Sequence, residues 1–147
     1  MNWVYDDGGR EEAGFKGKTG DCVCRAISIA TEMPYKEVYK LINETARSEK
    51  VPKRHRGSGK SSARTGVYKD CIHKVMKQLG WTWVPTMLVG QGCKVHLRAD
   101  ELPTGKIVCS LSKHLVAVVD GVVHDTYDST RDGTRCVYGY WTKVVDE

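Results

Sequence analysis

Apolar residues recur at helical spacing through the first half of the chain. A first helix is expected over residues 22–33, because apolar positions return every three or four residues until Pro34 ends the run. A second helix is expected to open near Tyr35. The clearest amphipathic pattern covers residues 68–79 and stops at Gly80, a typical residue just beyond a helix C-terminus.

From Trp81 onward the pattern changes to short runs rich in β-branched and aromatic residues. We expect strands over residues 81–84, 106–111, 114–119, 122–127 and 136–141. Asp120-Gly121 separates two of these runs and favours a two-residue type I′ turn, which needs positive φ at both positions. Helices followed by antiparallel strands predict an α+β fold.

One domain is expected over residues 1–147, because this length suits a single core and no repeat or linker divides the chain. Residues 1–15 are interpreted as an N-terminal arm or loop. Residues 51–65 combine many Lys and Arg with Gly and Ser, which predicts a solvated basic loop. The same charges could bind an acidic partner or, less favourably, nucleic acid, because no aromatic residue lies among them to stack on a base.

Composition is that of an ordinary globular domain, with 40% hydrophobic and 28% charged residues and a net charge of +5. No apolar run approaches the roughly 20 residues that span a bilayer, so no membrane association is expected. The first residues show neither the basic start nor the apolar stretch of a secretory signal. A cytoplasmic, reducing location is therefore expected.

The chain has six cysteines, and a reducing location favours thiols over disulfides. Cys22 and Cys24 are separated by one residue, and no second close pair follows to complete a structural zinc site. Cys71 with His73, or Cys93 with His96, could still contribute metal ligands. We expect no metal and no cofactor, and most of these cysteines should pack as small buried hydrophobes.

Cys22 is the candidate nucleophile. It follows the turn-forming segment Thr19-Gly20-Asp21 and opens the first predicted helix, where the helix dipole and free backbone N–H groups favour a thiolate. Asp21 or Thr19 could cap this helix. Cys24 should point to another side of the helix and pack or be exposed. A cysteine at a helix start need not be catalytic, so a catalytic role for Cys22 also requires a general base near the thiol.

The predicted hairpin supplies His114 as that base. If Asp120-Gly121 is a two-residue turn, His114 faces Tyr127 across the hairpin, and Asp125 lies diagonal to His114 on the same face. A carboxylate there could orient the imidazole and stabilise its charged form.

Two other residues of this region are less suited to that role. Asp128 is the rival third member of the triad, but strand alternation places it on the opposite face from His114. His124 also faces away from His114 and is not expected to be catalytic.

These segments resemble the papain-like cysteine peptidase superfamily, especially small bacteriocin-processing peptidase domains and short phage-encoded members. The similar stretches are residues 20–26, residues 114–121 and Asp125-Thr126-Tyr127, and the resemblance spans about residues 15–141. It implies N-terminal helices packed on a C-terminal antiparallel sheet and a triad of Cys22, His114 and Asp125. Asp125 falls where these enzymes carry the asparagine that orients the histidine.

The resemblance also implies where an oxyanion would bind. These enzymes usually carry a glutamine about six residues before the nucleophile, and this chain has Lys16 there, with Lys18 nearby. Lys16 and Lys18 are therefore the candidate oxyanion or substrate-binding side chains, together with the backbone N–H of Cys22.

The function expected from these residues is that of a cysteine peptidase or isopeptidase acting on a protein or peptide substrate. The same triad could instead transfer the acyl group to an amine. The alternative is a catalytically inactive papain-like binding module that uses the basic loop at residues 51–65 to bind nucleic acid or an acidic protein.

Overall fold

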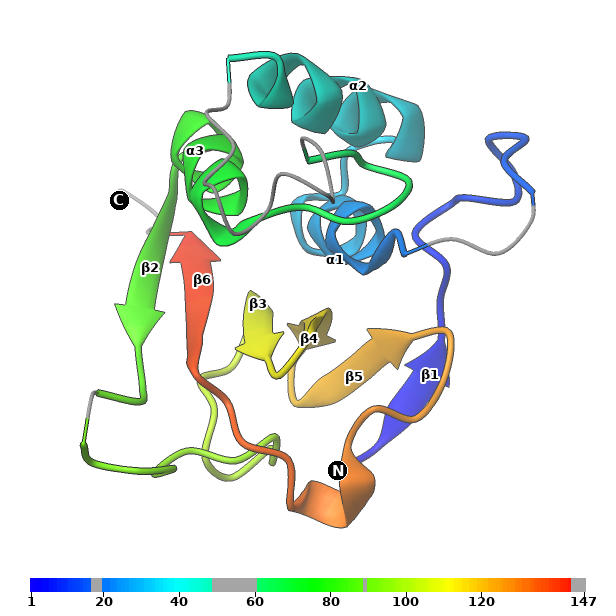
Figure 1. Cartoon of the computed structure of the whole chain (residues 1–147). Helices are drawn as coiled ribbons and strands as arrows, with labels where there is room; N and C mark the ends of the chain where they lie inside the picture. The colour runs from blue at the N-terminus through cyan, green and yellow to red at the C-terminus, as the bar shows by residue number, and fades with distance from the viewer. Residues whose placement is uncertain (17–19, 49–60, 89, 144–147) are drawn as a thin grey trace, which may run out of the picture.

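Three helices gather on one side of a mixed β-sheet (Figure 1). The computed structural model describes residues 1–16, 20–48, 61–88 and 90–143. The helices are α1 (Cys22–Thr31), α2 (Tyr35–Ala46) and α3 (Lys69–Gln78). The strands are β1 (Trp3–Tyr5), β2 (Trp81–Pro85), β3 (Lys106–Leu111), β4 (His114–Val119), β5 (Val122–Asp125) and β6 (Gly139–Lys143), and a short 3-10 helix, η2, covers Arg131–Gly133. The predicted α+β class is confirmed at this level.

The helices lie close to their predicted positions. α1 ends at Thr31, where Glu32 adopts a left-handed conformation with φ of 61°, and α2 begins directly after Pro34. α3 ends before Gly80, whose φ of 82° suits a residue just beyond a helix. α1 packs directly on β4 and also contacts β3 and β5, whereas α2 contacts α1 and α3. α3 contacts β2 at the edge of the sheet, so α1 is the helix that packs on its central strands.

The sheet order is β1-β5-β4-β3-β6-β2, and apolar residues line both of its faces. In β4, Leu115 and Ala117 join the core beneath the helices, whereas Val116 and Val118 join a second core on the opposite face. This alternation follows from the two-residue period of a strand. Segments between the strands cover the second face, and Leu97 contributes a fully buried side chain there.

The β4–β5 hairpin has the predicted two-residue turn. Val119 pairs with Val122, and Asp120 and Gly121 have φ of 48° and 78°. The Asp120 carboxylate also accepts a hydrogen bond from the backbone N–H of Gly105 at 2.8 Å. The turn fixes the register that sets His114 and Asp125 on one face.

The predicted N-terminal arm is wrong in one part, and so is the purely antiparallel sheet. Residues 3–5 form β1, which pairs in parallel with β5 at the edge of the sheet. All three β1 residues are exposed, so the segment carries no alternation of buried and polar positions. Its partner lies more than a hundred residues away, and local patterns do not report such pairings.

The last strand and two of the cysteines also differ from expectation. β6 begins at Gly139 and lies between β3 and β2, whereas Cys136 forms only an isolated bridge with His96. Cys93 and Cys136 form a disulfide with their Cα atoms 5.9 Å apart, so the expectation of thiols is wrong for this pair. Cys22, Cys24 and Cys109 are free thiols, and Cys24, Cys71 and Cys109 are buried as expected. The disulfide depends on a long-range contact that the spacing of the cysteines does not reveal.

Replacing Gly139 with alanine is expected to destabilise the protein by about 1–3 kcal/mol. A β-carbon at this position would overlap the ring of Trp83 and lie 2.9 Å from the carbonyl oxygen of Val84. Urea denaturation should show the loss, with Thr82→Ala at an exposed position of the same strand pair as the control. A Gly139→Ala variant as stable as the control would contradict this packing.

Candidate active site

The start of α1 places Cys22 against the segment that precedes α3. The backbone N–H of Gly20 donates to the carbonyl of Arg64 at 2.9 Å. A β-carbon on Gly20 would lie 2.9 Å from the carbonyl oxygen of Thr65, so only glycine fits this approach. Asp21 occupies the N-cap position but makes no capping hydrogen bond with its side chain, contrary to the prediction; Thr19, the other predicted cap, lies outside the described residues.

His114 and Asp125 form a buried hydrogen-bonded pair. The Nε2 atom of His114 lies 2.6 Å from Oδ2 of Asp125, and the two side chains are only 7% and 3% exposed. His114 opens β4 and Asp125 ends β5, so the hairpin register brings them together as predicted. The ring of Tyr127 packs beside the imidazole with the centroids 5.3 Å apart. The His114 imidazole therefore contacts both the Asp125 carboxylate and the Tyr127 ring.

Cys22 lies beside His114 in the lining of one pocket, close enough for the imidazole to act on the pKa of the thiol. Because Nε2 of His114 is taken by Asp125, Nδ1 is the ring nitrogen left for the thiol. Burial by itself raises the pKa of Cys22, but the His114 hydrogen bond and charge, the N–H of Leu115 and the charge of Arg25 together lower it below its ordinary value. Burial likewise disfavours charged His114, yet Asp125 and Cys22 raise its pKa to about 9. These opposite shifts favour a thiolate–imidazolium pair at neutral pH.

Asp125 is held by four groups. Its Oδ2 also accepts a hydrogen bond from the Ser129 hydroxyl at 2.9 Å, and its Oδ1 accepts one from the N–H of Thr126 at 2.7 Å. Arg25 Nη2 lies 3.5 Å from the same Oδ1. Burial raises the pKa of Asp125, but its bond to charged His114 and the Thr126 and Ser129 bonds outweigh it and lower the pKa. Asp125 therefore stays ionised beside the imidazole.

The other predicted or weighed residues lie elsewhere. Asp128 is exposed in the segment beyond β5, where its carboxylate accepts hydrogen bonds from the N–H and hydroxyl of Thr130. His124 contacts Asp6 through Nδ1 at 3.0 Å. Cys24 is fully buried, and burial raises its pKa to about 12.

A pocket of about 350 Å³ opens beside Cys22 and His114. It lies between the start of α1, the segment before α3 and the β3–β4 turn. Its apolar wall includes Val23, Val67 and Leu111. Besides Cys22 and His114, the charged lining side chains among the described residues are those of Lys69 and Lys113. The pocket offers a place for one side chain of a substrate next to the thiol.

Lys16 does not line this pocket. It lines a neighbouring one of about 440 Å³, together with Arg25, Asp21 and Thr126, and its carbonyl accepts a hydrogen bond from Arg64 at 3.3 Å. Its suggested role at the oxyanion stays a prediction. Lys18 lies outside the described residues, as do residues 51–60 of the predicted basic loop, so the binding-module alternative is likewise untested.

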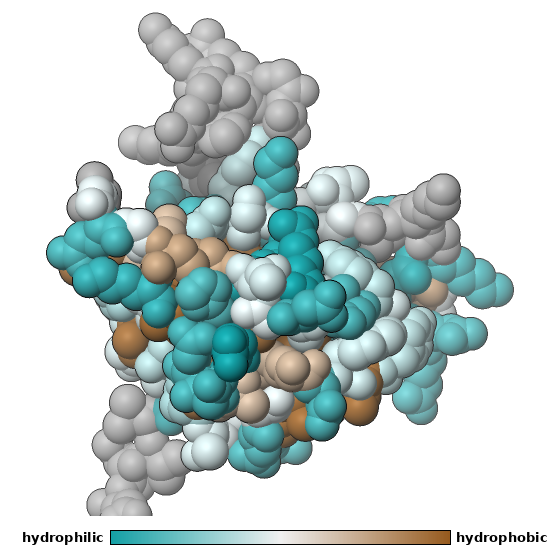
Figure 2. Space-filling view, turned by 90° about the horizontal axis from the view of Figure 1, so that it is seen from below, coloured by the Kyte–Doolittle hydropathy of each residue, from teal (hydrophilic) through white to brown (hydrophobic). Residues whose placement is uncertain are grey.

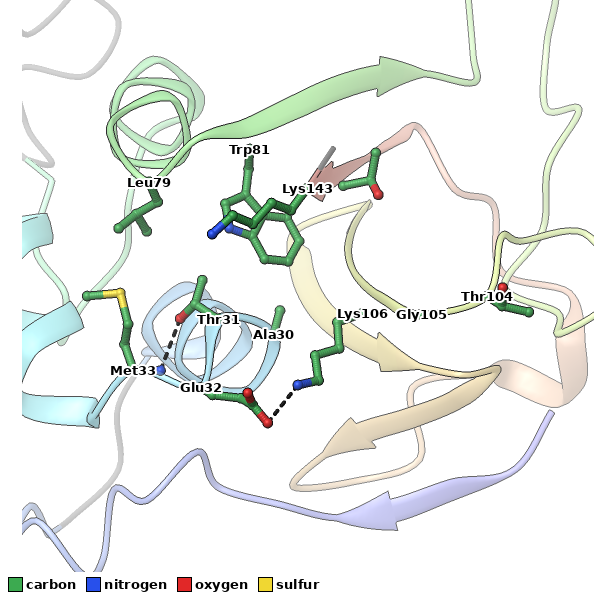
Figure 3. Close-up of a pocket in the computed structure, with 11 residues that line it drawn as sticks. Ala30, Thr31, Glu32, Met33, Leu79, Trp81, Thr104, Gly105, Lys106 and Lys143 are labelled. Atoms are coloured by element: carbon green, nitrogen blue, oxygen red, sulfur yellow. Dashed lines mark hydrogen bonds and ion pairs between the residues drawn. The ribbon is translucent and has the colours of Figure 1, made fainter. Parts of the chain in front are cut away.

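A larger pocket, of about 660 Å³, lies at the opposite end of α1 (Figure 3). Trp81 and Leu79 form its apolar wall, and Lys106 pairs with Glu32 at 2.6 Å on its rim. Among the described residues, no cysteine or histidine lines this pocket. Because α1 is ten residues long, about 15 Å separates the pocket from the Cys22 thiol. The triad and this pocket are therefore separate features.

On the face seen in Figure 2, hydrophilic residues predominate and hydrophobic areas are small and scattered. Within the described ranges, no helix has the length and apolar content needed to cross a bilayer. In the same part of the chain, no group of three or more His, Cys, Asp and Glu side chains is arranged to hold a metal ion.

The sequence reasoning missed Arg25 and Ser129, both of which contact Asp125. The spacing of Asp21 and Arg25, four residues apart on one helix, is a signal that could have indicated an ion pair. Ser129 follows the end of β5 in an irregular segment, where no periodicity predicts which way a side chain points.

No protein-family model, curated protein or solved structure matches this chain. The interpretation of the site therefore rests on its geometry and on the chemistry of its residues.

Proposed function

We propose that this protein is a cysteine peptidase or isopeptidase of the papain-like type, in which Cys22, His114 and Asp125 form the catalytic triad. The observation that carries the proposal is the buried hydrogen bond between His114 and Asp125, with His114 and Cys22 side by side in the lining of one pocket. A nucleophile, a base and a group that orients the base are the three parts that thiol acyl transfer requires.

In the proposed reaction, the Cys22 thiolate attacks the carbonyl carbon of a peptide or isopeptide bond. The resulting tetrahedral oxyanion collapses, the C–N bond breaks, and His114 gives its proton to the leaving amine. Water then attacks the thioester while His114 accepts a proton from it, and the carboxylic acid product leaves as the Cys22 thiolate returns. Asp125 keeps the imidazole in the required tautomer throughout.

The oxyanion needs hydrogen-bond donors beside Cys22. The α1 N-terminus supplies the backbone N–H of Cys22, and the side chain of the N-cap residue Asp21 makes no capping hydrogen bond. In this proposal a second donor comes from the residues before α1, the region of Lys16.

The papain-like resemblance is part of the proposal. Its support is the order of the elements. The nucleophile opens a helix that packs on the sheet, the histidine begins a later strand, and the carboxylate ends the strand that follows. A cytoplasmic location belongs to the same proposal.

A burst experiment tests the proposed chemistry without knowledge of the substrate. Mixing the protein with p-nitrophenyl acetate should release about one equivalent of p-nitrophenol rapidly as the acyl-enzyme forms, followed by slower turnover. Cys22→Ala should give no burst, whereas Cys71→Ala, at a buried cysteine that does not line the pocket, should retain it.

Peptidase activity needs a separate readout. Incubation with a peptide library made by digesting a proteome, followed by mass spectrometry of new N-termini, should reveal cleavages that Cys22→Ala lacks. A protein that shows neither burst nor Cys22-dependent cleavage is not a thiol hydrolase.

A further inference from the structure

A buried ion-pair network behind the triad connects the nucleophile helix to the carboxylate of β5. Arg25 lies one turn beyond Cys22 on α1 and is 13% exposed. Its Nη1 donates to Oδ1 of Asp21, and its Nη2 lies 3.5 Å from Oδ1 of Asp125. One guanidinium thus contacts two carboxylates that are 1% and 3% exposed. Asp125 and the helix that carries the thiol are joined by one side chain.

Further groups fix the far end of this network. Asp21 Oδ2 accepts a hydrogen bond from the Tyr35 hydroxyl of α2 at 2.6 Å, and Nε of Arg10 lies 3.4 Å from it. The N-terminal loop also packs on the helix, because a β-carbon on Gly8 would lie 3.0 Å from the carbonyl oxygen of Arg25. Asp21 is therefore held from α2 and from the loop, and it holds Arg25 in turn.

We propose that Arg25 is a positioning residue: its guanidinium joins Asp21 to Asp125 and thereby fixes the His114 imidazole against the Cys22 thiol. This inference rests on the proposed function of the triad. Arginine suits the position because its planar fork offers separate N–H groups to two carboxylates, which a lysine ammonium at the end of a flexible stem does not. Its positive charge also lies close enough to Cys22 to favour the thiolate.

The charges around the triad are few among the described residues. α1 contributes Arg25, Asp21 lies at its N-cap, and the N-terminal loop contributes Arg10. The two pockets beside the site add other charged groups at their linings: Asp7, Glu11 and Lys16 on one side, and Lys69 and Lys113 on the other. Arg25 is the only one of these cations in contact with Asp125.

Arg25→Gln tests the proposal, because glutamine keeps hydrogen-bonding groups but removes the charge and the fork. The rate of iodoacetamide alkylation of Cys22 should be measured between pH 5 and 10, with Cys22 and Cys24 distinguished by fragment-ion mass spectrometry. Loss of the cation disfavours the thiolate, so the acid limb should move up by about one pH unit and the rate at pH 6 should fall about tenfold. Arg98→Gln, at a surface ion pair with Asp100, is the matched control and should leave the profile unchanged.

Arg25→Lys separates geometry from charge. The ammonium keeps the charge, so the acid limb should stay within about 0.3 pH unit of the wild type. The plateau rate should still fall about threefold, because one ammonium cannot hold both carboxylates in place. If circular dichroism shows that Arg25→Gln does not fold, the plateau alkylation rate of Arg25→Lys tests the positioning role of Arg25.

The outcomes separate the two proposals. If wild-type Cys22 titrates like an ordinary thiol, the proposed triad fails. If wild-type Cys22 forms a thiolate at low pH that depends on His114, but the Arg25 variants follow the wild-type profile, then only the role of Arg25 is overturned. A role in stability alone would lower the melting temperature and leave the pH profile in place.

Discussion

Replacing His114 with alanine is expected to lower the rate of iodoacetamide alkylation of Cys22 at pH 6 about 100-fold. The hydrogen bond and charge of His114 are what outweigh burial at the thiol. Without them, burial raises the pKa of Cys22, and little thiolate remains at this pH. The measurement is the rate of alkylation against pH, with each cysteine identified by mass spectrometry.

The chain offers matched controls for this experiment. His124→Ala removes a histidine that contacts Asp6 on the other side of β5, so it should leave the labelling of Cys22 unchanged. Cys24 provides an internal reference in the same peptide, because its pKa of about 12 keeps its labelling slow in every variant. If Cys22 is alkylated as fast in His114→Ala as in the wild type, the imidazole does not activate the thiol.

Asp125→Ala and Asp125→Asn are expected to differ. Alanine removes the acceptor that holds Nε2 of His114, so the burst rate with p-nitrophenyl acetate should fall about 100-fold. An asparagine oxygen can still accept a hydrogen bond from Nε2–H and keep the tautomer of His114. The burst rate of Asp125→Asn should therefore fall no more than about tenfold. Circular dichroism must first show that both variants fold, because Asp125 also pairs with Arg25 and Ser129.

The pKa of His114 gives an independent measure of the same pair. Asp125 raises that pKa, so removing the carboxylate charge should lower it from about 9 toward the ordinary value of about 6.5. In both variants the imidazole should therefore lose its proton at lower pH than in the wild type. An NMR titration of the His114 ring protons checks this, and the same pKa in wild type and Asp125→Asn would contradict the charge interaction.

The free energy of unfolding should also depend on the protonation of His114 and Asp125. Because the pKa of His114 is raised on folding, its pairing stabilises the protein fully below about pH 6.5, and this stabilisation is lost as the pH rises to about 9. Asp125 has a lowered pKa, so its contribution is present above the ordinary range of an aspartate and is lost on acidification.

The sequence alone determined the elements that carry the site. Helical periodicity placed α1, α2 and α3, because each buries one apolar stripe, and that stripe shows in the spacing of residues. Asp120-Gly121 determined the hairpin, because few residue pairs adopt positive φ at both positions of its turn. Once the turn is fixed, the two-residue period of a strand puts Asp125 on the face of His114.

Only the tertiary structure decided which side chains meet across elements that are distant in sequence. The contact of Cys22 with His114, the Arg25 bridge to Asp125 and the Cys93–Cys136 disulfide join residues from separate segments. The parallel pairing of β1 with β5 is of the same kind. Periodicity reports the face that a residue occupies within its own element, whereas these contacts depend on how elements pack, and packing energy is shared among many residues.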